Sequence, residues 1–343
     1  MRNIKDYDIE ELKEVFKKLG QKAYRAEQVF KWLYIEEVEN FEEMTNLSKE
    51  LRQVLKNEFS IGSFKVLQKQ ESKDGTKKYL FELEDGNAIE TVLMKYHHGN
   101  SVCVSTQVGC KMGCKFCAST GIGFVRNLSS GEIVQEVLQI SRMEQIRVSN
   151  VVFMGIGEPF DNYENVIKAI QILNNQKGLN IGARHISIST SGIVPMIYRL
   201  ADENIQCTLS ISLHATSDKK RSEMMPINKK YPIKELIEAC QYYIQKTNRR
   251  ISFEYALAKE ENDNLENAKQ LIQLLKGMLC HVNLIPINKI DGGKFAKSTN
   301  ENIIRFRDYL NEHGIVATIR RELGSDIDAA CGQLRKKNIT KTE

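Results

Sequence analysis

Residues 101–120 read SVCVSTQVGCKMGCKFCAST and contain four of the eight cysteines of the chain. Three of them, Cys110, Cys114 and Cys117, form a C-x-x-x-C-x-x-C pattern after VCVSTQV, an apolar run with the alternation of a β-strand. Cys103 lies within that run. Eight cysteines in a chain of 343 residues do not resemble the framework of a small secreted domain. The pattern therefore indicates metal binding or catalysis in a reducing compartment.

Three kinds of site use cysteines in this way. A structural zinc site needs four ligands, usually paired as C-x-x-C, and no second pair follows in the sequence. A structural disulfide does not suit a reducing compartment. A four-iron cluster held by three thiolates leaves one iron without a protein ligand, where a substrate or cofactor can coordinate. The spacing favours the cluster, and zinc stays open as the alternative.

The sequence around this stretch predicts an α/β fold. From about residue 101 onward, apolar strand-like runs such as NVVFMGIG, HISISTSG and CTLSISLH alternate with helix-like segments. This alternation predicts parallel strands joined by right-handed crossovers. Six such units and a last strand, GIVATIR, are too few for a closed eight-unit barrel, so we predict a partial (β/α)6 TIM-like barrel. Its chemistry is expected in the loops that follow the strands.

The rest of the chain divides by its periodicity. Three segments before residue 60 have helical spacing, and the third starts at a Ser48 cap. Alternating runs joined at Asp74-Gly75 and Asp85-Gly86 then predict hairpins. The predicted domains are a small helical accessory domain (1–60), a β-meander extension (61–96), the barrel with a C-terminal cysteine segment (97–334) and a mobile basic tail (335–343).

Composition adds weaker constraints. The formal net charge is +5, which is compatible with a polyanionic partner but does not identify one. The first residues lack the apolar region of a signal peptide, and no stretch approaches the length needed to span a bilayer. We expect a cytoplasmic protein with no membrane partner.

Two features together resemble the radical S-adenosylmethionine (SAM) superfamily: the three-cysteine spacing and its place on a (β/α)6 chain. In that superfamily the open iron chelates the methionine moiety of SAM. The segment MGIGEP resembles the superfamily's G-G-E-P type segment, which implies that Gly157 and Glu158 meet the SAM amino group. Without the cysteines, the same segment reads as a tight β-to-α turn in which Glu158 caps a helix.

Longer motifs resemble one family within this superfamily, the RlmN family of dual-specificity 23S rRNA and tRNA adenine-C2 methyltransferases. The resemblance extends from the helical module to Leu334, nearly the whole chain. It rests on CVSTQVGCKMGCKFCAST, GFVRNLSSGEIVQEV, MGIGEP, ISTSGIVP, SLHATSDKKRSEMMPINKKYP, VNLIPIN and RRELGSDIDAACGQL.

The resemblance implies a mechanism that uses two molecules of SAM per turnover. One methylates Cys331, which gives an S-methylcysteine. The other binds a single [4Fe-4S] cluster on Cys110, Cys114 and Cys117 and yields a 5′-deoxyadenosyl radical, which takes a hydrogen from that methyl group. The resulting radical adds to carbon 2 of an adenosine in the peptidyl-transferase centre of 23S rRNA, or of the adenosine 3′ of the anticodon in some tRNAs. Carbon 2 is not nucleophilic, so radical chemistry suits it.

The same resemblance implies how the covalent protein–RNA adduct is resolved. Cys103 attacks the sulfur of Cys331 and forms a transient disulfide. Glu90 accepts the proton from carbon 2. Read from pattern alone, Cys103 is a buried strand cysteine and Glu90 is an outward strand residue, with Ile89 and Thr91 on the other face.

Further site residues implied by the resemblance lie where apolar strands end, as expected for a barrel mouth. The SAM contacts are Gly157, Glu158, Ser189, Ser212, the backbone of Leu213, His214 and Asn288. A histidine that is simply satisfied at a strand end remains the alternative for His214. The other three cysteines, Cys207, Cys240 and Cys280, match no family role and are predicted to pack in the interior.

RNA contacts and partners are the least visible features of the sequence. Basic residues that offer phosphate contacts are Lys219, Lys220, Arg221, Lys229, Lys230, Arg320, Arg321, Arg335, Lys336 and Lys337, although short charge runs usually form solvated faces. The helical module resembles the family's helix-hairpin-helix-like accessory domain and is expected to contact RNA through residues such as Arg25, with Trp32 in its core. The expected partners are 23S rRNA, tRNA and a flavodoxin-like or ferredoxin-like electron donor, and we expect a monomer.

Two alternatives remain. The sibling Cfr family modifies carbon 8 of the same rRNA adenosine, and the forms GEPF, CASTGIG and ISTSG in this chain favour the carbon-2 family. The loop after Asn288 lacks a proline that is frequent in the RlmN family. From a different class, a non-catalytic zinc-stabilised RNA-binding module would explain the cysteines and the basic clusters.

Overall fold

The computed structural model describes residues 1–287, 295–327 and 334. Within these residues one sheet has ten strands in the order β14-β13-β12-β11-β10-β9-β6-β5-β4-β3. Its parallel strands are β6 (Gly99–Cys103), β9 (Val148–Phe153), β10 (Ile186–Thr190), β11 (Thr208–Ser212), β12 (Ile251–Leu257), β13 (Cys280–Pro286) and β14 (Ala317–Ile319). The predicted α/β fold with a mostly parallel sheet is confirmed.

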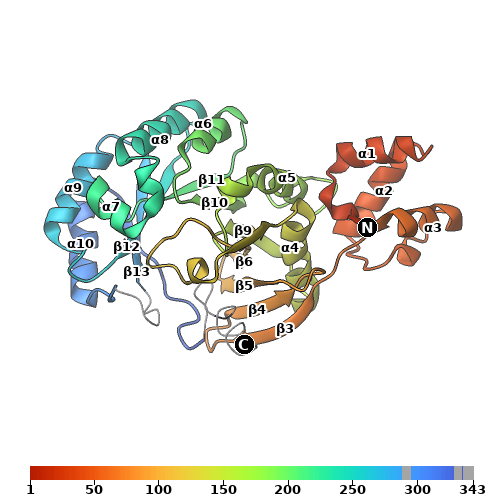
Figure 1. Ribbon diagram of the computed structural model, residues 1–343, viewed down its shortest axis with the longest axis horizontal. Coiled ribbons are helices and arrows are strands. Elements are labelled where there is room, and N and C mark those ends of the chain that lie inside the picture. The colour runs from red at the N-terminus through yellow and green to blue at the C-terminus, as the bar shows by residue number, and fades with distance from the viewer. Residues whose placement is uncertain (288–294, 328–333, 335–343) are drawn as a thin grey trace.

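Helices connect the parallel strands and cover the sheet (Figure 1). They are α4 (Ser130–Glu144), α5 (Tyr163–Asn174), α6 (Val194–Asp202), α7 (Asp218–Met224), α8 (Ile233–Thr247), α9 (Leu265–Leu275) and α10 (Asn300–Glu312). Helix α4 starts where the side chain of Ser129 accepts a hydrogen bond from the backbone N–H of Glu132, and the Glu132 carboxylate accepts one from the N–H of Ser129. This reciprocal cap satisfies two N–H groups that the first helical turn leaves without partners.

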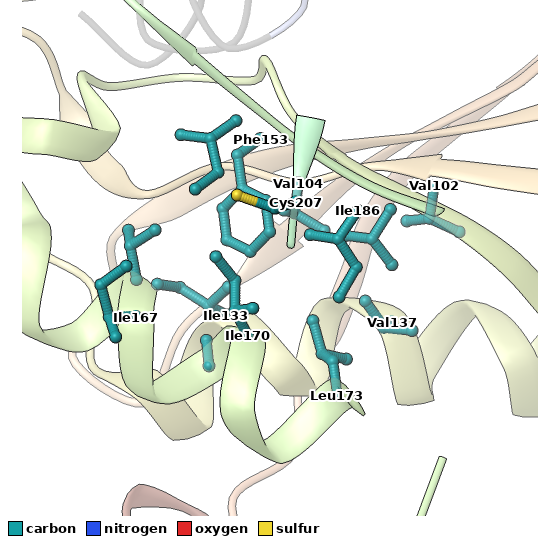
Figure 2. Close-up of a cluster of buried hydrophobic side chains, with 14 of the residues drawn as sticks. Val102, Val104, Ile133, Val137, Phe153, Ile167, Ile170, Leu173, Ile186 and Cys207 are labelled. Carbon is teal, nitrogen blue, oxygen red and sulfur yellow. The ribbon is translucent and has the colours of Figure 1, made fainter. Parts of the chain in front are cut away.

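The main core lies between the sheet and the helices. Figure 2 shows Ile133 and Val137 of α4 and Ile170 of α5 in one buried cluster with strand residues. Cys207, just before β11, belongs to this cluster, and Cys240 of α8 is also fully buried. The prediction that these two cysteines pack in the interior is confirmed, whereas Cys280 at the start of β13 is only half-buried.

The extension continues the barrel sheet on one side. Strands β3 (Lys65–Glu71), β4 (Lys77–Glu82) and β5 (Ala88–Tyr96) are antiparallel, and β5 pairs with β6. The predicted turn glycines, Gly75 and Gly86, have φ values of +84° and +80°. Such values are accessible to glycine at little steric cost, which is why Asp-Gly signals these turns.

The N-terminal helices α1 (Ile9–Lys18), α2 (Ala23–Tyr34) and α3 (Lys49–Glu58) gather at one end of the molecule (Figure 1). A short strand pair, β1 (Arg2–Asn3) and β2 (Phe59–Ser60), joins the two ends of this segment. Asp6 connects it to the barrel, because its carboxylate accepts a hydrogen bond of 2.9 Å from the N–H of Gly131 at the start of α4. Trp32 is only partly buried and donates a hydrogen bond to Asn46.

The segment before the cysteines differs from the prediction. VCVSTQV is not one strand: β6 ends at Cys103, and a separate hairpin of β7 (Gln107–Gly109) and β8 (Phe124–Asn127) carries the cysteine loop. The break coincides with a hydrogen bond from the strand backbone to a side chain of α4. The backbone N–H of Ser105 donates to the buried carboxylate of Glu136 at 3.0 Å instead of to a neighbouring strand.

Among the described residues, every helix is too short or too polar to cross a membrane.

Candidate active site

A cavity of about 670 Å³ opens at the carboxyl ends of the parallel strands. Its wall includes the cysteine loop, the segment after β9, the ends of β10 to β13 and residues 320–325 of the C-terminal segment. The volume lies within the range of sites for small molecules and cofactors. The predicted site residues on its wall are Cys110, Cys114, Cys117, Gly157, Glu158, Ser189, Ser212 and His214.

The cysteine loop is held in shape by its own backbone. Gly109 has a φ of +81°, and a Cβ there would lie 1.7 Å from the carbonyl oxygen of Gly123, so only glycine fits. Cys110 donates its backbone N–H to that same oxygen at 3.2 Å. Further along, the hydroxyl of Thr120 donates to the carbonyls of Cys114 and Cys117, at 3.1 and 2.9 Å. The three thiols are thereby presented from one compact turn.

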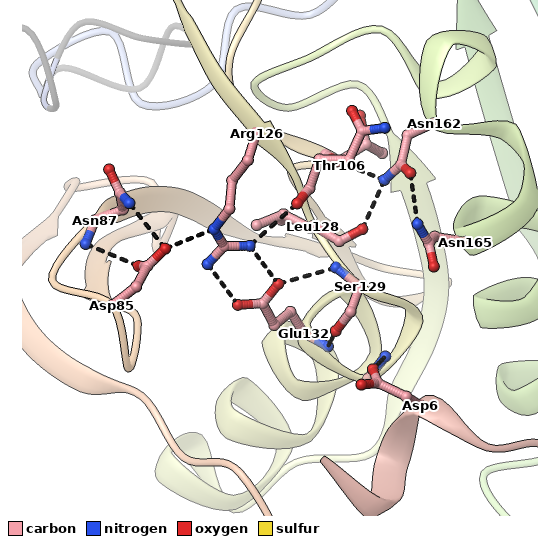
Figure 3. A network of polar contacts seen from close by, with 12 residues as sticks. Asp6, Asp85, Asn87, Thr106, Arg126, Leu128, Ser129, Glu132, Asn162 and Asn165 are labelled. Carbon is pink, nitrogen blue, oxygen red and sulfur yellow. Dashed lines mark hydrogen bonds and ion pairs between the residues drawn. The ribbon is translucent and has the colours of Figure 1, made fainter. Parts of the chain in front are cut away.

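A polar network anchors the hairpin that carries this loop (Figure 3). Arg126 of β8 donates two hydrogen bonds of 2.8 Å to the carboxylate of Glu132 and a third, of 2.6 Å, to Asp85. Asp85 belongs to the β4–β5 turn, and Glu132 also caps α4. Two-pronged guanidinium–carboxylate pairs are geometrically specific. The network therefore fixes β8 against both the extension and the barrel.

The donor chemistry of the loop suits an iron–sulfur cluster. Burial raises the pKa of the Cys110 thiol to about 12, and burial likewise raises that of Cys114, with the charge of Cys117 adding to both shifts. These thiols lose their protons when they bind a metal. No three His, Cys, Asp or Glu side chains in the described ranges lie close enough together to hold one ion. Because a cubane cluster binds each thiolate through a different iron, three soft donors on one cavity wall fit such a cluster.

The MGIGEP segment packs tightly at the end of β9. Gly157 has a φ of +116°, and a Cβ there would lie 2.6 Å from the hydroxyl of Thr106. The Glu158 carboxylate accepts hydrogen bonds from the N–H of Phe160, the hydroxyl of Thr190 and the N–H of Ser191, at 3.0, 2.7 and 2.7 Å. Glu158 therefore caps a short 3-10 helix and also lies on the cavity wall. Burial raises its pKa.

The strand-end residues converge on the same cavity. Ser189 is the penultimate residue of β10 and Ser212 ends β11, and both line the wall. The His214 ring accepts a hydrogen bond at Nδ1 from the N–H of Ala256 and packs edge-on against Phe116 of the cysteine loop. Burial lowers the His214 pKa to about 3, so its ring is neutral near pH 7. Leu213 does not line the cavity, and its carbonyl accepts a hydrogen bond from Arg221.

Glu90 and Cys103 lie on adjacent strands of the extension and barrel. Cys103 pairs in register with Val92 and is buried with Val92 and Met94, and the partly buried Leu323 packs against this cluster. Side chains alternate along β5, so Glu90 shares a face with Val92, which lines the cavity. Glu90 is not an outward residue: it is 3% exposed and forms an ion pair of 2.8 Å with the fully buried Lys78.

Two predicted site residues, Asn288 and Cys331, lie outside the described residues. The segment that leads toward Cys331 is described as far as residue 327. Its Leu323 packs in the apolar cluster that contains Cys103. Gly324 donates its N–H to Asp74 at 2.8 Å, which ties the segment to the β3–β4 turn.

Sequence patterns missed three residues of this region. Glu254 of β12 is a buried carboxylate on the cavity wall that accepts a hydrogen bond of 2.8 Å from Asn283. Its only signal is a charged residue within the apolar run RISFEYALA. Nothing in the alternating run KKYLFELE indicated that Lys78 would be buried. Arg221 was expected among surface phosphate contacts, but it is fully buried, so that expectation is wrong.

The fold and this cavity define a class of protein. A mostly parallel sheet with a three-cysteine loop at the carboxyl ends of its strands is the arrangement of radical SAM enzymes, and the radical SAM superfamily model matches residues 104–272. A crystal structure of a radical SAM methyltransferase from Sphaerobacter thermophilus is 44% identical, with a TM-score of 0.92 over 97% of this chain and 99% of that chain. The superfamily implies a [4Fe-4S] cluster and SAM.

Comparison with relatives narrows the class. The family model described as "Ribosomal RNA large subunit methyltransferase N-terminal domain" matches residues 2–61. A "Probable dual-specificity RNA methyltransferase RlmN" of Clostridium perfringens is 56% identical over 99% of this chain and 98% of its own length. The protein of the same description from Clostridium botulinum (strain Okra) is 55% identical over 99% of this chain and its own full length. The chain belongs to the RlmN family of radical SAM RNA methyltransferases.

Proposed function

We propose that the chain methylates carbon 2 of an adenosine in 23S rRNA and of the adenosine 3′ of the anticodon in some tRNAs. The observation that carries the proposal is a single cavity wall that joins the three-cysteine loop to Glu158, Ser189, Ser212 and His214. Cys103 packs in one cluster with Leu323, a residue of the segment that leads to Cys331. Family membership sets aside the alternative of a non-catalytic zinc module.

Each proposed role uses a side chain of this chain. The [4Fe-4S] cluster and SAM, when bound, would supply the radical chemistry that an unreactive carbon requires. Cys110, Cys114 and Cys117 would hold the cluster. Glu158, Ser189, Ser212, His214, the backbone of Gly157 and Leu213, and Asn288 would bind SAM.

The covalent steps are assigned to three residues. Cys331 would carry the methyl group and join the RNA. Glu90 would accept the proton from carbon 2, and its buried position beside Lys78 keeps water away from the carboxylate. Loss of that proton, and of the unpaired electron of the adduct to a one-electron acceptor, would leave a thioether between Cys331 and the RNA. Cys103 would then attack the sulfur of Cys331 as a thiolate, so that the disulfide forms, the carbon–sulfur bond breaks, and the methylene carbon leaves with the electron pair and takes up a proton to become the methyl group of the RNA.

The test combines two variants with mass spectrometry of the RNA. After anaerobic reconstitution, Cys103→Ala should accumulate protein joined covalently to RNA, whereas Cys331→Ala should assemble its cluster but transfer no methyl group. The wild-type product should be 2-methyladenosine. Product at carbon 8 would instead assign the Cfr-type reaction, and methylation by Cys331→Ala would exclude the S-methylcysteine route.

A further inference from the structure

The largest fully buried side chain among the described residues is that of Arg221 in α7. Its Nε donates to the carbonyl of Leu213 at 3.1 Å, and its Nη2 donates to the carbonyls of Ser191 and Ser212, at 2.7 and 3.0 Å. Its Nη1 donates to the side-chain oxygen of Asn228 at 3.0 Å. All four acceptors are uncharged, so four of the five guanidinium N–H groups bond to neutral oxygens.

Such a charge is expensive to bury. A desolvated cation is tolerated where dipoles and a nearby anion compensate the lost water. Burial lowers the Arg221 pKa to about 10, so the group remains a cation near pH 7. The carbonyl dipoles supply part of the compensation. The carboxylate of the exposed Asp218 bonds to Asn228 and not to the guanidinium, so it acts on the buried charge only across that side chain.

The elements that carry Arg221 pack against the cysteine loop. The N–H of Lys115 donates to the carbonyl of Met224 in α7 at 2.9 Å. A Cβ on Gly113 would lie 3.4 Å from the ring of Pro226, in the 3-10 helix after α7. Cys114 is buried with Met224 and Met225, and the N–H of Met225 donates to the backbone carbonyl of Arg221 at 2.6 Å. Arg221 itself does not reach the cavity wall.

We propose that Arg221 is a positioning residue whose buried charge stabilises the reduced form of the cluster held by Cys110, Cys114 and Cys117, and so raises its midpoint potential. Three thiolates make the cluster site anionic, and each added electron makes it more so. A fixed cation inside the protein therefore favours the reduced form, since interactions there are weakly screened. The proposal rests on the three-cysteine ligand set of the proposed function and is independent of the RNA substrate.

The experiment is a redox titration of the reconstituted enzyme, followed by electron paramagnetic resonance, with and without SAM. Arg221→Met should disfavour cluster reduction about tenfold, which is about 59 mV for a one-electron couple. Arg221→Lys keeps the charge and should stay near the wild-type potential. The matched control is Lys219→Met, which removes the same charge from an exposed position of the same helix and should leave the potential unchanged.

A second variant keeps Arg221 in place, which covers the case in which Arg221→Met fails to assemble its cluster. Asn228 is buried and also bonds to the carboxylate of the exposed Asp218. The exchange Asp218→Asn with Asn228→Asp moves that carboxylate onto the guanidinium without altering the net charge. The midpoint potential of this double variant should therefore lie below that of the wild-type protein.

The proposal is overturned if the exchange leaves the potential unchanged, if fully loaded Arg221→Met has the wild-type potential, or if Arg221→Lys shifts as far as Arg221→Met. A wild-type protein that assembles no cluster would refute the ligand set itself, which separates failure of the proposed function from failure of this inference.

Discussion

Lys78 and Glu90 form a buried ion pair on the inner face of the extension, with N–O separation of 2.8 Å and exposures of 0% and 3%. Desolvating two charges costs several kcal/mol per ion, and their attraction offsets this only while both partners are present. The hydroxyl of Ser105 also fixes the backbone of Glu90, at 2.7 Å. The pair therefore holds the carboxylate in place for the proton transfer proposed above.

Removing either Lys78 or Glu90 alone should destabilise the protein more than removing both. Lys78→Met is expected to lower the free energy of unfolding by roughly 3–5 kcal/mol, because it leaves a buried charge, and adding Glu90→Leu should recover most of that loss. Urea denaturation of the two single variants and the double variant measures the coupling. The control is Lys65→Met on the same sheet, whose exposed pair with Glu82 should contribute less than about 1 kcal/mol. Additive losses would show that the pair does not act as a unit.

Some residues of the site could be predicted from the neighbouring sequence, and others could not. That the three cysteines lie together on one loop could be predicted because their spacing is local, whereas Glu158 was expected at the same cavity only through the resemblance of MGIGEP. The burial of Arg221 could not be predicted, because the residue follows two lysines in a charged segment that is typical of a solvated face. Its burial depends on the carbonyls of Ser191, just after β10, and of Ser212, at the end of β11. The pairing of Lys78 with Glu90 likewise depends on the register between β4 and β5.

At the scale of elements, the β7–β8 hairpin decides how the cysteines are presented. Gly109 at the end of β7 lies close to Gly123, the residue before β8, and Arg126 of β8 bonds to Glu132 and Asp85. Strands β7 and β8 pair with each other and are not strands of the ten-stranded sheet. The position of the hairpin therefore depends on these contacts, and a change at Gly109 should displace the whole loop.

Gly109→Ala should prevent normal cluster assembly. The new Cβ would lie 1.7 Å from the carbonyl oxygen of Gly123, and the φ of +81° would itself be strained. We expect the iron and sulfide content after anaerobic reconstitution to fall to less than about half that of the wild-type protein. Gly121→Ala is the matched control in the same loop, since nothing lies within 4 Å of its Cβ position. Full iron content in Gly109→Ala would show that the loop tolerates separation of β7 from β8.

Elements were predictable where local signals define them. The helical spacing and the Ser48 cap predicted α3, and the Asp-Gly turns predicted the hairpins of the extension. The break between β6 and β7 was not predictable from VCVSTQV, whose alternation continues through it. Its cause is the carboxylate of Glu136, which lies on α4 and takes the N–H of Ser105 out of the strand ladder.

At the scale of the molecule, the C-terminal segment returns to the extension and closes the structure. Asp326 accepts hydrogen bonds from the hydroxyl of Ser72 and, at 3.1 Å, from the N–H of Lys73, while Asp74 accepts one from Gly324. We call these contacts of residues 72–74 with 324–326 the C-terminal clasp. They hold the pKa of Asp74 down at about 2 and also lower that of Asp326, so both carboxylates are charged near pH 7. The clasp thus fixes the chain five residues before Cys331.

Loosening the C-terminal clasp should uncouple the two halves of the proposed reaction. In the proposed reaction, SAM cleavage would use the cysteine loop and the strand ends, whereas methyl transfer would also use Cys331. Asp326→Ala removes the two hydrogen bonds that its carboxylate accepts from Ser72 and Lys73, so the docked segment should become less populated. The ratio of methyladenosine to 5′-deoxyadenosine, both quantified by mass spectrometry in one reaction, should fall several-fold.

Asp308→Ala removes an exposed carboxylate of α10 that pairs with the adjacent Arg307, and it should leave the ratio unchanged. An equal loss of both products in Asp326→Ala would instead place the defect at the cluster, and an unchanged ratio would mean that Cys331 reaches the cavity without the clasp.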